Sequence, residues 1–532
     1  MIIDIRTLPD GSRIEADLCI VGGGAAAIAM TRKLSGSPLT VAILESGGLT
    51  FDDATQALAA GQRSGVPYFD LDKSRFRLLG GSTFRWGART TPLKPIDFAR
   101  RDWVPLSGWP ICADTLRPYE DEIFDIVGLH RPFDYDARVW KRFGKTPPAV
   151  DDSLLEYSAF QFGKNLGLGE VFRRALEQAP NVTVYLHANV LGLRPTERGD
   201  HVEHVDVGAL SGQRYIVRAD RYVLASGGIE NPRLLLLSDS VDPKGLCNEH
   251  DVVGRYFMEH PTASAGTVVS ERWQEVLDVF TPGLLGGRLV EVGLALAPAF
   301  QERERCLNAV VRPVAIVEQD ATQALRELLW LLRHRRLHSE VTSARDRAWF
   351  TDRFAAIARD PLRIVSNLVR HATGKPKRFN VESVQLQVRI EQEPNPDSRV
   401  TLAAATDAFG QRRAHLHWTM SERERRTMRL AAETFDRELR RLGMGRVEMA
   451  SWLTAPELRW PDDLVGGHHH MGTTRMSADA RTGVVNADQR AHAVDNLYIT
   501  GSSVFPTAGY ANPTMTVLAL ALRLGEHLRA TG

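Results

Sequence analysis

A glycine-rich turn between an apolar strand and a helix constrains the fold of this chain more than any other feature. Residues 17–21 form a short apolar run typical of a buried parallel strand, and residues 28–34 predict a helix. Between them, residues 22–27 read Gly-Gly-Gly-Ala-Ala-Ala and match the spacing of a dinucleotide fingerprint. In such a turn Gly22 permits the tight bend, and Gly24 lets backbone amides approach a pyrophosphate at the helix N-terminus.

A carboxylate after the next predicted strand strengthens this interpretation. Residues 41–44, Val-Ala-Ile-Leu, end at Glu45, which lies 21 positions after Gly24. A carboxylate at that place can accept hydrogen bonds from both ribose hydroxyls of an adenosine. Strand, turn, helix, strand and acid together favour a dinucleotide site over a glycine turn that only packs. They do not distinguish FAD from NAD.

Strand patterns farther along predict the rest of the architecture. Residues 222–228 predict another apolar strand that ends in small residues, followed by a helix that starts within residues 229–232. In residues 384–391, apolar and polar residues alternate with the period of a strand that has one covered face. We expect an antiparallel sheet here, with residues 399–403 and 414–418 as the neighbouring strands.

Two helical stretches flank this sheet in the sequence. Ser421 and Glu424 form a capping box, which predicts a helix that runs to about Leu442 and is stopped by Gly443. The stretch 322–378 also has a helical pattern and carries 13 Lys or Arg against 5 Asp or Glu. It is either an ordinary helical insertion with a solvated basic face, or a lid, a partner surface or a membrane-surface helix. Its apolar face is Leu325, Leu328, Leu329 and Leu332.

Length and composition limit the class of protein. A chain of 532 residues is expected to form two or three domains. The near balance of 66 basic and 65 acidic residues gives no field that would attract a nucleic acid. Residues 1–14 lack the pattern of a signal peptide, and no run approaches the roughly 20 apolar residues that span a bilayer. With four scattered cysteines, of which Cys19 is expected to be buried, a cytoplasmic location is expected.

The last seventy residues carry the candidates for proton transfer. His468, His469 and His470 are adjacent, and Asn512 follows 43 positions after His469, in an Asn-Pro-Thr turn before an apolar helix. Histidine suits proton transfer because its ordinary pKa lies near working pH. No metal site is expected, since adjacent histidines point in different directions and no Cys or carboxylate stands nearby at ligand spacing. Structural roles are expected for His468 and His470.

The order of these motifs resembles that of the glucose-methanol-choline (GMC) oxidoreductases. The shared motifs are the glycine fingerprint, a Gly-Gly-Ser loop with Trp86, an Ala-Ser-Gly-Gly-Ile-Glu-Asn-Pro segment at residues 225–232, an H-x-x-G-T motif and an N-P-T-x-T motif. Residues 254–261 also resemble a Gly-Arg…His-Pro segment of that family. The resemblance covers essentially the whole chain. It is closest to the branch that contains pyranose oxidases and bacterial sugar-alcohol dehydrogenases.

This resemblance implies an α/β FAD-binding domain of Rossmann-like, GMC type and an α+β substrate domain built on an antiparallel sheet. The domains would be discontinuous in sequence. Residues 1–262 and 461–532 would form the FAD-binding domain, interrupted by loop and substrate segments near 88–180. Residues 263–460 would form the substrate-binding domain, with the helical basic insertion at 322–378.

The resemblance also assigns roles to residues. His469 is the histidine of the H-x-x-G-T motif, and Asn512 takes the second active-site position, which is His or Asn in relatives. The expected reaction is FAD-dependent oxidation of a CH–OH group of a sugar, glycoside or polyol to the carbonyl. His469 would take the hydroxyl proton while hydride passes to flavin N5, and Asn512 would orient the same oxygen.

The expected cofactor-binding residues come from several short segments. They are Gly22, Gly24, Ala25, Ala26, Glu45, Ser46, Gly80, Gly81, Ser82, Arg85, Trp86, Val190, Ala225, Gly227, Gly501, Ser502, Asn512, Pro513 and Thr514. Some relatives carry a histidine before the loop tryptophan and bind flavin through it covalently. Arg85 occupies that position here, so non-covalent FAD is expected.

Several alternatives stay open at this point. The alternatives are a redox-neutral hydroxynitrile-lyase-type enzyme on the same scaffold, an oxidase or dehydrogenase of a non-sugar alcohol, an NAD-linked dehydrogenase without flavin, and a non-catalytic flavin-binding or electron-relay subunit. Oxygen, a quinone or a redox protein would take the electrons, and a small subunit that exports the chain to the periplasm, or a membrane partner, stays an option. Trp418, Phe379 and Tyr510 are candidates either for stacking on a sugar or for core packing.

Overall fold

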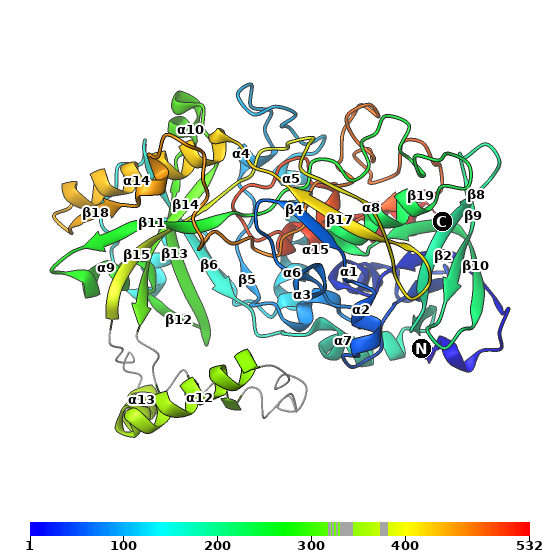
Figure 1. Cartoon of the computed structure of the whole chain (residues 1–532), viewed down its shortest axis with the longest axis horizontal. Helices are drawn as coiled ribbons and strands as arrows, with labels where there is room; N and C mark the ends of the chain where they lie inside the picture. The colour runs from blue at the N-terminus through cyan, green and yellow to red at the C-terminus, as the bar shows by residue number, and fades with distance from the viewer. Residues whose placement is uncertain (318–320, 322–323, 326–327, 330–343, 373–380, 532) are drawn as a thin grey trace.

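The computed structural model describes residues 1–531 apart from 318–320, 322–323, 326–327, 330–343 and 373–380. Within the described residues, two large sheets lie beside each other, the first to the right and the second to the left in Figure 1. The chain passes between them several times, so each sheet is assembled from segments that are distant in sequence. The predicted fold class, a parallel nucleotide-type sheet joined to an antiparallel sheet, is confirmed.

The first sheet is built around the strand that precedes the glycine turn. Its order is β1-β7-β3-β2-β10-β9-β8, with β19 paired to β10, and its centre is parallel. The strands are β1 (Ile2–Asp4), β2 (Arg13–Val21), β3 (Val41–Leu44), β7 (Val182–Leu186), β8 (Asn189–Pro195), β9 (Val202–Gly208), β10 (Arg214–Leu224) and β19 (Leu497–Ile499). The central strands are apolar on both faces because helices and loops cover both sides of a parallel sheet. Cys19 on β2 is buried, as predicted.

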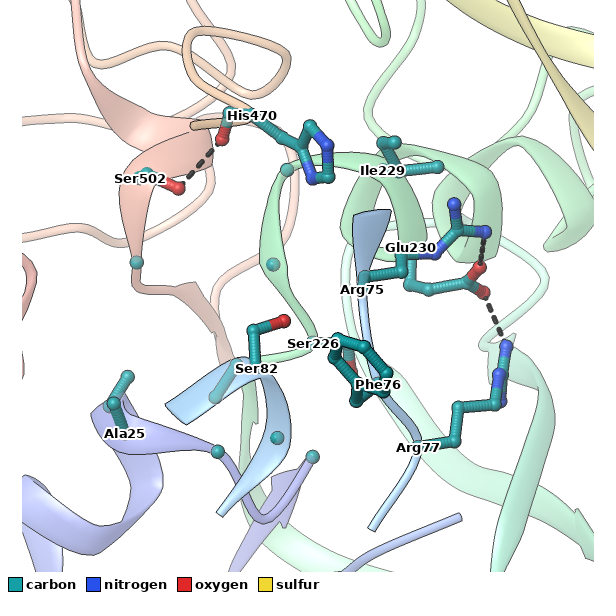
Figure 2. A pocket seen from close by; sticks show the side chains of 18 of the residues that line it. Ala25, Arg75, Phe76, Arg77, Ser82, Ser226, Ile229, Glu230, His470 and Ser502 are labelled. Carbon is teal, nitrogen blue, oxygen red and sulfur yellow. Dashed lines mark hydrogen bonds and ion pairs between the residues drawn. The ribbon is translucent and has the colours of Figure 1, made fainter. Parts of the chain in front are cut away.

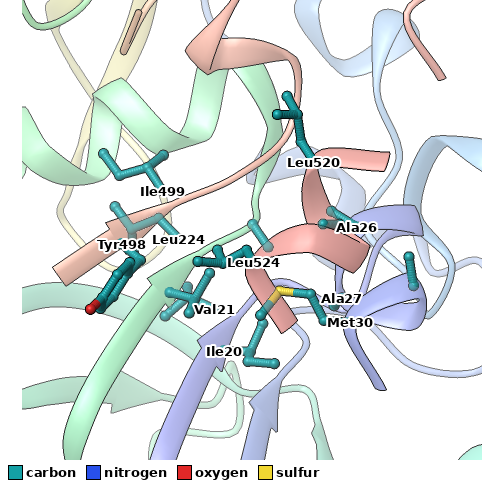
Figure 3. Close-up of a cluster of buried hydrophobic side chains, with 14 of the residues drawn as sticks. Ile20, Val21, Ala26, Ala27, Met30, Leu224, Tyr498, Ile499, Leu520 and Leu524 are labelled. Carbon is teal, nitrogen blue, oxygen red and sulfur yellow. The ribbon is translucent and has the colours of Figure 1, made fainter. Parts of the chain in front are cut away.

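Two helices from opposite ends of the chain pack together against this sheet. They are α1 (Ala25–Leu34), which follows the glycine turn, and α15 (Thr514–Ala530), which follows the Asn-Pro-Thr turn. Figure 3 shows Leu524 of α15 in one cluster with Met30 of α1 and Val21 of β2. Each fully buried Leu contributes about 1.5–3 kcal/mol. This packing brings the start of α15, and with it Asn512, to the same end of the sheet as the glycine turn.

The second sheet is antiparallel, with the order β18-β11-β15-β14-β13-β6-β5 and with β12 paired to β13. Its strands are β5 (Arg89–Thr90), β6 (Leu155–Phe162), β11 (Thr262–Val269), β12 (Gly283–Leu285), β13 (Arg288–Leu296), β14 (Ala309–Val317), β15 (Val381–Ile390) and β18 (Arg446–Met449). On β15, Leu386 and Val388 are buried and Gln387 and Arg389 are half-buried, as the alternation predicts. Helix α14 (Glu422–Arg441) packs against β14 and β15.

The predicted neighbours of β15 are wrong. β16 (Arg399–Thr406) and β17 (Arg412–Trp418) form a separate sheet with β4 (Gln62–Gly65), whereas β15 pairs with β11 and β14. Alternation shows that one face of a strand is covered, but it carries no information about which strand supplies the hydrogen bonds.

The predicted capping box is present at the start of α14. The Ser421 backbone donates to the Glu424 carboxylate at 2.8 Å, and the Arg423 backbone donates to Ser421 Oγ at 3.1 Å. The helix ends at Arg441, and Gly443 follows with a left-handed φ of +64°. The remaining short helices are α2 (Asp53–Ala57), α3 (Leu71–Ser74), α4 (Pro95–Phe98), α5 (Ala113–Leu116), α6 (Glu120–Val127), α7 (Leu168–Gln178), α8 (Gly227–Leu237), α9 (Trp273–Phe280) and α10 (Pro298–Glu304).

The basic insertion is helical in the part that the structure describes. It contains α12 (Ala344–Arg359) and α13 (Pro361–Ala372), which are drawn away from both sheets in Figure 1. Leu362 and Val365 of α13 are exposed. Of the predicted apolar face, Leu332 lies outside the described residues. Among the helices of the described ranges, none is long and apolar enough to cross a bilayer.

A buried ion pair joins the loop after α4 to the end of β15. The Arg101 guanidinium donates two hydrogen bonds to Glu391, at 2.6 and 2.7 Å, and both side chains are 1% exposed or less. Asp97 lies close by, and its pKa is raised to about 6, first by burial and then by the charge of Glu391. This pair fixes the segment between the two sheets, next to the site described below.

Candidate active site

A single cavity of about 650 Å³ connects the glycine turn of the first sheet to the second sheet. Its wall contains every residue that the sequence assigns to the cofactor, together with His469. These residues come from segments that are up to several hundred positions apart in the sequence. The fold therefore places residues from separate motifs around one cavity. Their roles toward a cofactor stay predictions.

The glycine turn has the shape that a close-packed cofactor phosphate requires. Gly22 has a φ of +102°, and a Cβ there would lie 2.9 Å from the Ala225 carbonyl oxygen, so only glycine fits. A Cβ on Gly24, by contrast, would meet nothing within 4 Å, because this residue borders the cavity. The turn therefore leaves open space at the N-terminus of α1, where backbone N–H groups and the helix dipole favour an anion.

The Glu45 carboxylate is held beside this turn by backbone donors. Gly23 N donates to one carboxylate oxygen at 2.7 Å, and Gly47 N donates to the other at 2.8 Å. The side chain is buried and borders the cavity. Ser46 Oγ donates to the same oxygen as Gly47 N, at 3.2 Å, so the oxygen that faces Gly23 keeps a lone pair for a ribose hydroxyl. The position and chemistry of Glu45 fit the ribose of an adenosine.

A charged cluster forms another part of the cavity wall (Figure 2). Glu230 accepts from Arg75 at 2.6 Å and forms an ion pair with Arg77 at 2.9 Å, and Figure 2 shows Ser82 and Ser226 bordering the same pocket. Burial raises the pKa of the Glu230 carboxyl, but the neighbouring arginine charges outweigh it and hold this pKa well below its ordinary value. The carboxylate stays ionised and fixes the arginines.

Glu259, in the connection that leads into β11, holds the histidine loop in place. Its carboxylate accepts from the backbone N–H groups of His260 and Gly467, both at 2.8 Å, and from that of His469 at 2.9 Å. The Tyr68 hydroxyl donates to the same carboxylate. Four donors on one buried carboxylate fix the backbone on both sides of the site.

His469 and His260 contact each other through their Nδ1 atoms, which lie 2.8 Å apart. The Nε2 atom of His260 lies 3.2 Å from the Ala508 carbonyl oxygen. Because a carbonyl only accepts, the His260 proton resides on Nε2, and the Nδ1 of a neutral His260 accepts from His469. His469 therefore carries its proton on Nδ1, and its Nε2 presents a lone pair.

Asn512 faces that lone pair. Its Nδ2 lies 3.5 Å from His469 Nε2, while its Oδ1 accepts from Arg89 at 3.2 Å and from Arg389 at 3.3 Å. A guanidinium only donates, so the two arginines fix the orientation of the amide, with the NH₂ group toward His469. Hydrogen-bond chemistry thus determines the proton positions from Ala508 through both histidines to Asn512.

The environment keeps both histidines neutral. Burial is the main cause that lowers the pKa of His469 well below 6.5, and the charges of His260 and Arg389 add to it. Burial likewise lowers the pKa of His260 to about 3. At pH 7 the Nε2 of His469 is therefore an unprotonated base on the cavity wall.

The other two histidines of the loop have different contacts. The ring of His468 packs on Phe69 with ring centroids 4.0 Å apart. His470 is buried, and its backbone carbonyl accepts from Ser502 Oγ at 2.7 Å, the contact visible in Figure 2. In the described part of the chain, no group of three or more His, Cys, Asp or Glu is placed to hold a metal ion.

Sequence reasoning missed four residues of the site. His260, Glu259, Arg89 and Arg389 come from the second sheet and its connections, and no local motif marked them except the Glu-His-Pro sequence at 259–261.

Two of the three aromatic candidates for sugar stacking are core residues. Trp418 and Tyr510 are fully buried and do not border the cavity. Trp418 donates to Gln392 at 2.9 Å, and Tyr510 donates to Ser158 at 2.9 Å. The core-packing alternative therefore holds for both, while Phe379 lies outside the described residues.

Comparisons with known proteins agree with this architecture. A family model described as GMC oxidoreductase matches residues 394–521. The 6'''-hydroxyparomomycin C oxidase of Streptomyces lividus is 24% identical, over 97% of this chain and 92% of that protein. The 2-methyl-1,2-propanediol dehydrogenase of Mycolicibacterium austroafricanum is also 24% identical, over 85% and 80%.

A solved structure shares the fold over nearly the whole chain. The pyridoxine 4-oxidase of Mesorbium loti superimposes with a TM-score of 0.56 and 17% identity, over 96% of this chain and 99% of that structure. Its likeness supports the fold alone. The family match at residues 394–521 and the paired sheets around the cavity make the chain similar to the GMC oxidoreductases.

Proposed function

We propose that this protein oxidises a CH–OH group of a sugar, glycoside or related polyol to the carbonyl, with FAD bound in the cavity. One observation carries this proposal: the unprotonated Nε2 of His469 stands on the cavity wall beside the Asn512 amide. A hydroxyl placed between these groups meets a proton acceptor and a hydrogen-bond donor at once. The related oxidase and dehydrogenase named above act, by their names, on hydroxyl-bearing compounds.

The residues present fit FAD. The open space at Gly24 and the start of α1 would take the pyrophosphate, and Glu45 would bind the adenosine ribose. The start of α15 borders the same cavity at Thr514, where a helix dipole favours negative charge. When bound, FAD supplies the hydride acceptor. Because Arg85 replaces a histidine through which some relatives attach flavin, we propose that the cofactor is non-covalent.

Proton transfer is then the task of the chain's own residues. His469 Nε2 accepts the hydroxyl proton. The Nδ1–H group of the resulting imidazolium continues to donate a hydrogen bond to His260 Nδ1. Asn512 donates to the substrate oxygen and orients it. Arg89 and Arg389, which polarise the Asn512 amide, strengthen this hydrogen bond as the oxygen becomes negative.

Anaerobic reduction of the bound flavin tests this function. Purified holoenzyme would be mixed with monosaccharides, glycosides, other polyols and simple alcohols in turn, and the loss of the yellow absorbance recorded. Bleaching by hydroxyl compounds is the expected result, and the rate at which colour returns on admitting air separates oxidase from dehydrogenase. A protein that takes up no FAD, or a holoenzyme that no alcohol bleaches, contradicts the proposal.

A further inference from the structure

The face of the second sheet that borders the cavity carries a surplus of positive charge. Arg389 on β15, Arg312 on β14 and Arg89 on β5 lie near one another on this face, with Glu291 on β13 between two of them. Glu291 forms ion pairs with Arg89, at 2.9 Å, and with Arg312. This wall thus carries three guanidinium groups and one carboxylate, which pairs with two of them.

Arg389 contributes most to this surplus. It donates to Asn512 at 3.3 Å and to Thr262 Oγ1 at 3.4 Å, which are both uncharged groups. Among the residues that the structure describes, no carboxylate lies within ion-pair distance of Arg389. The charges of Glu291 and Glu259 act on Arg389 from farther away, and its guanidinium borders the cavity.

Both Arg89 and Arg389 keep donors for a ligand. Each guanidinium has five N–H bonds, and the contacts with described residues use only Nε and one Nη atom of each. Both residues border the cavity. Two forks of this kind match the oxygens of a carboxylate.

Both arginines remain cationic in this setting. Burial is the first cause that lowers the pKa of Arg89 to about 9 and that of Arg389 to about 10; the second is the charge of Arg389 for Arg89 and the charge of Arg312 for Arg389. Both values lie above neutral pH. Positive charges held this close in a half-buried wall favour an anion and disfavour a cationic group such as an amino sugar.

We propose that Arg89 and Arg389 form a subsite for a carboxylate of the substrate. The substrate is then an alcohol that carries a carboxylate a few atoms from the oxidised carbon, such as a sugar acid or another hydroxy acid. The spacing follows from Asn512, whose single amide group separates the two arginines from His469 Nε2. This inference rests on the proposed function for the hydroxyl end, whereas anion binding itself is testable without turnover.

Binding of a non-reactive pair of probes tests the subsite. Cyclohexanecarboxylate and cyclohexanecarboxamide have the size of a pyranose and no hydroxyl to oxidise. Each would be titrated into oxidised holoenzyme while the flavin spectrum is followed. We expect the carboxylate to bind about 10-fold or more tightly than the amide, as a charge-assisted contact requires. Equal affinity for the two probes overturns the proposal.

Charge-matched variants identify the residue responsible. Arg389→Gln should abolish the preference for the carboxylate. Arg312→Gln removes the same charge from the next strand without touching the cavity wall, and it should keep most of the preference. If Arg312→Gln loses as much preference as Arg389→Gln, or if Arg389→Gln retains it, a contact subsite is wrong.

Turnover with matched alcohols separates this inference from the proposed function. D-glucuronate and D-glucose would be compared in anaerobic flavin reduction, together with glycerate and glycerol. Faster reduction by the acids, lost in Arg389→Gln, supports the subsite. Faster reduction by the neutral alcohols overturns it and leaves the proposed function intact. If no alcohol bleaches the flavin, the proposed function fails, while the probe titration still decides whether the arginines bind an anion.

Discussion

His260 donates to a backbone carbonyl through Nε2 and therefore accepts from His469 through Nδ1, across 2.8 Å. This hydrogen bond places the proton of neutral His469 on Nδ1 and leaves Nε2, on the cavity wall, as the base. His260 itself is fully buried and does not border the cavity, so it acts through His469. Without an acceptor at Nδ1, His469 would sample both tautomers. Only the tautomer protonated on Nδ1 has an unprotonated Nε2 on the cavity wall.

Two substitutions of His260 separate positioning from packing. His260→Leu removes the acceptor and should slow flavin reduction about 10- to 100-fold, below the roughly 10⁴-fold cost of a wrong tautomer in a serine-protease triad. His260→Asn restores an acceptor near the place of Nδ1 and should recover part of the rate. Single-turnover kinetics with varied substrate would show the loss in the limiting rate rather than in the apparent affinity. Equal losses in both variants would indicate a purely structural role.

The buried histidines make stability sensitive to acid. His260, His469 and His470 have pKa values lowered chiefly by burial, so the folded protein stays unprotonated where the unfolded chain takes up protons, below about pH 6.5. The free energy of unfolding therefore falls as pH decreases from 6.5 toward 5. Each histidine contributes up to about 1.4 kcal/mol per pH unit.

The matched experiment compares urea denaturation of the wild type and of His470→Gln between pH 8 and pH 5. Below pH 6.5, removing one buried histidine should reduce the slope of the unfolding free energy against pH by the amount that one proton contributes. Above pH 7 the slope should be the same for both proteins. Identical slopes for the two proteins would show that His470 is protonated in the folded state.

Glu45 is expected to determine FAD affinity. Glu45→Ala removes two oxygens beside the glycine turn and should weaken FAD binding about 10- to 100-fold, the range for hydrogen bonds to a charged group. Glu45→Gln, which keeps one acceptor, should lose less. Glu15→Ala, on the exposed part of β2, is the control and should bind FAD like the wild type. Titration of apoprotein with FAD measures all three, and unchanged affinity in Glu45→Ala would contradict the assignment.

The buried pair of Arg101 and Glu391 is expected to matter for stability and not for chemistry. Arg101→Met leaves Glu391 buried without its partner and should cost about 3–5 kcal/mol of unfolding free energy. The double variant Arg101→Met, Glu391→Met should recover much of that loss because no charge remains unpaired. Denaturation of the single and double variants forms the test, and a double variant less stable than Arg101→Met would contradict the unpaired Glu391 charge as the cause of the loss.

The site residues that belong to short sequence motifs could be predicted from the sequence. Gly22, Gly24 and Glu45 belong to one strand-turn-helix-strand unit, and His469 and Asn512 each stand in a short signature. The structure places all five on one cavity wall, which is a matter of tertiary packing between α1 and α15.

The rest of the site depends on contacts that no local pattern encodes. Arg89 and Arg389 come from strands 300 positions apart, and the alternation in β15 reveals a polar face without revealing what it faces. The same limitation explains why β16 and β17 were wrongly expected beside β15. His260 was a histidine without an assigned role until its partner, more than 200 positions away, was known.

The most direct test of the account is the rate of anaerobic flavin reduction in His469→Ala. With an alcohol that bleaches the wild-type flavin, this variant should bind FAD normally and reduce it about 10²- to 10⁴-fold more slowly, the usual contribution of a general base. His468→Asn, whose ring packs on Phe69 instead, should stay close to the wild-type rate. A His469→Ala enzyme that reduces its flavin at the wild-type rate would contradict the assignment of His469 as the base.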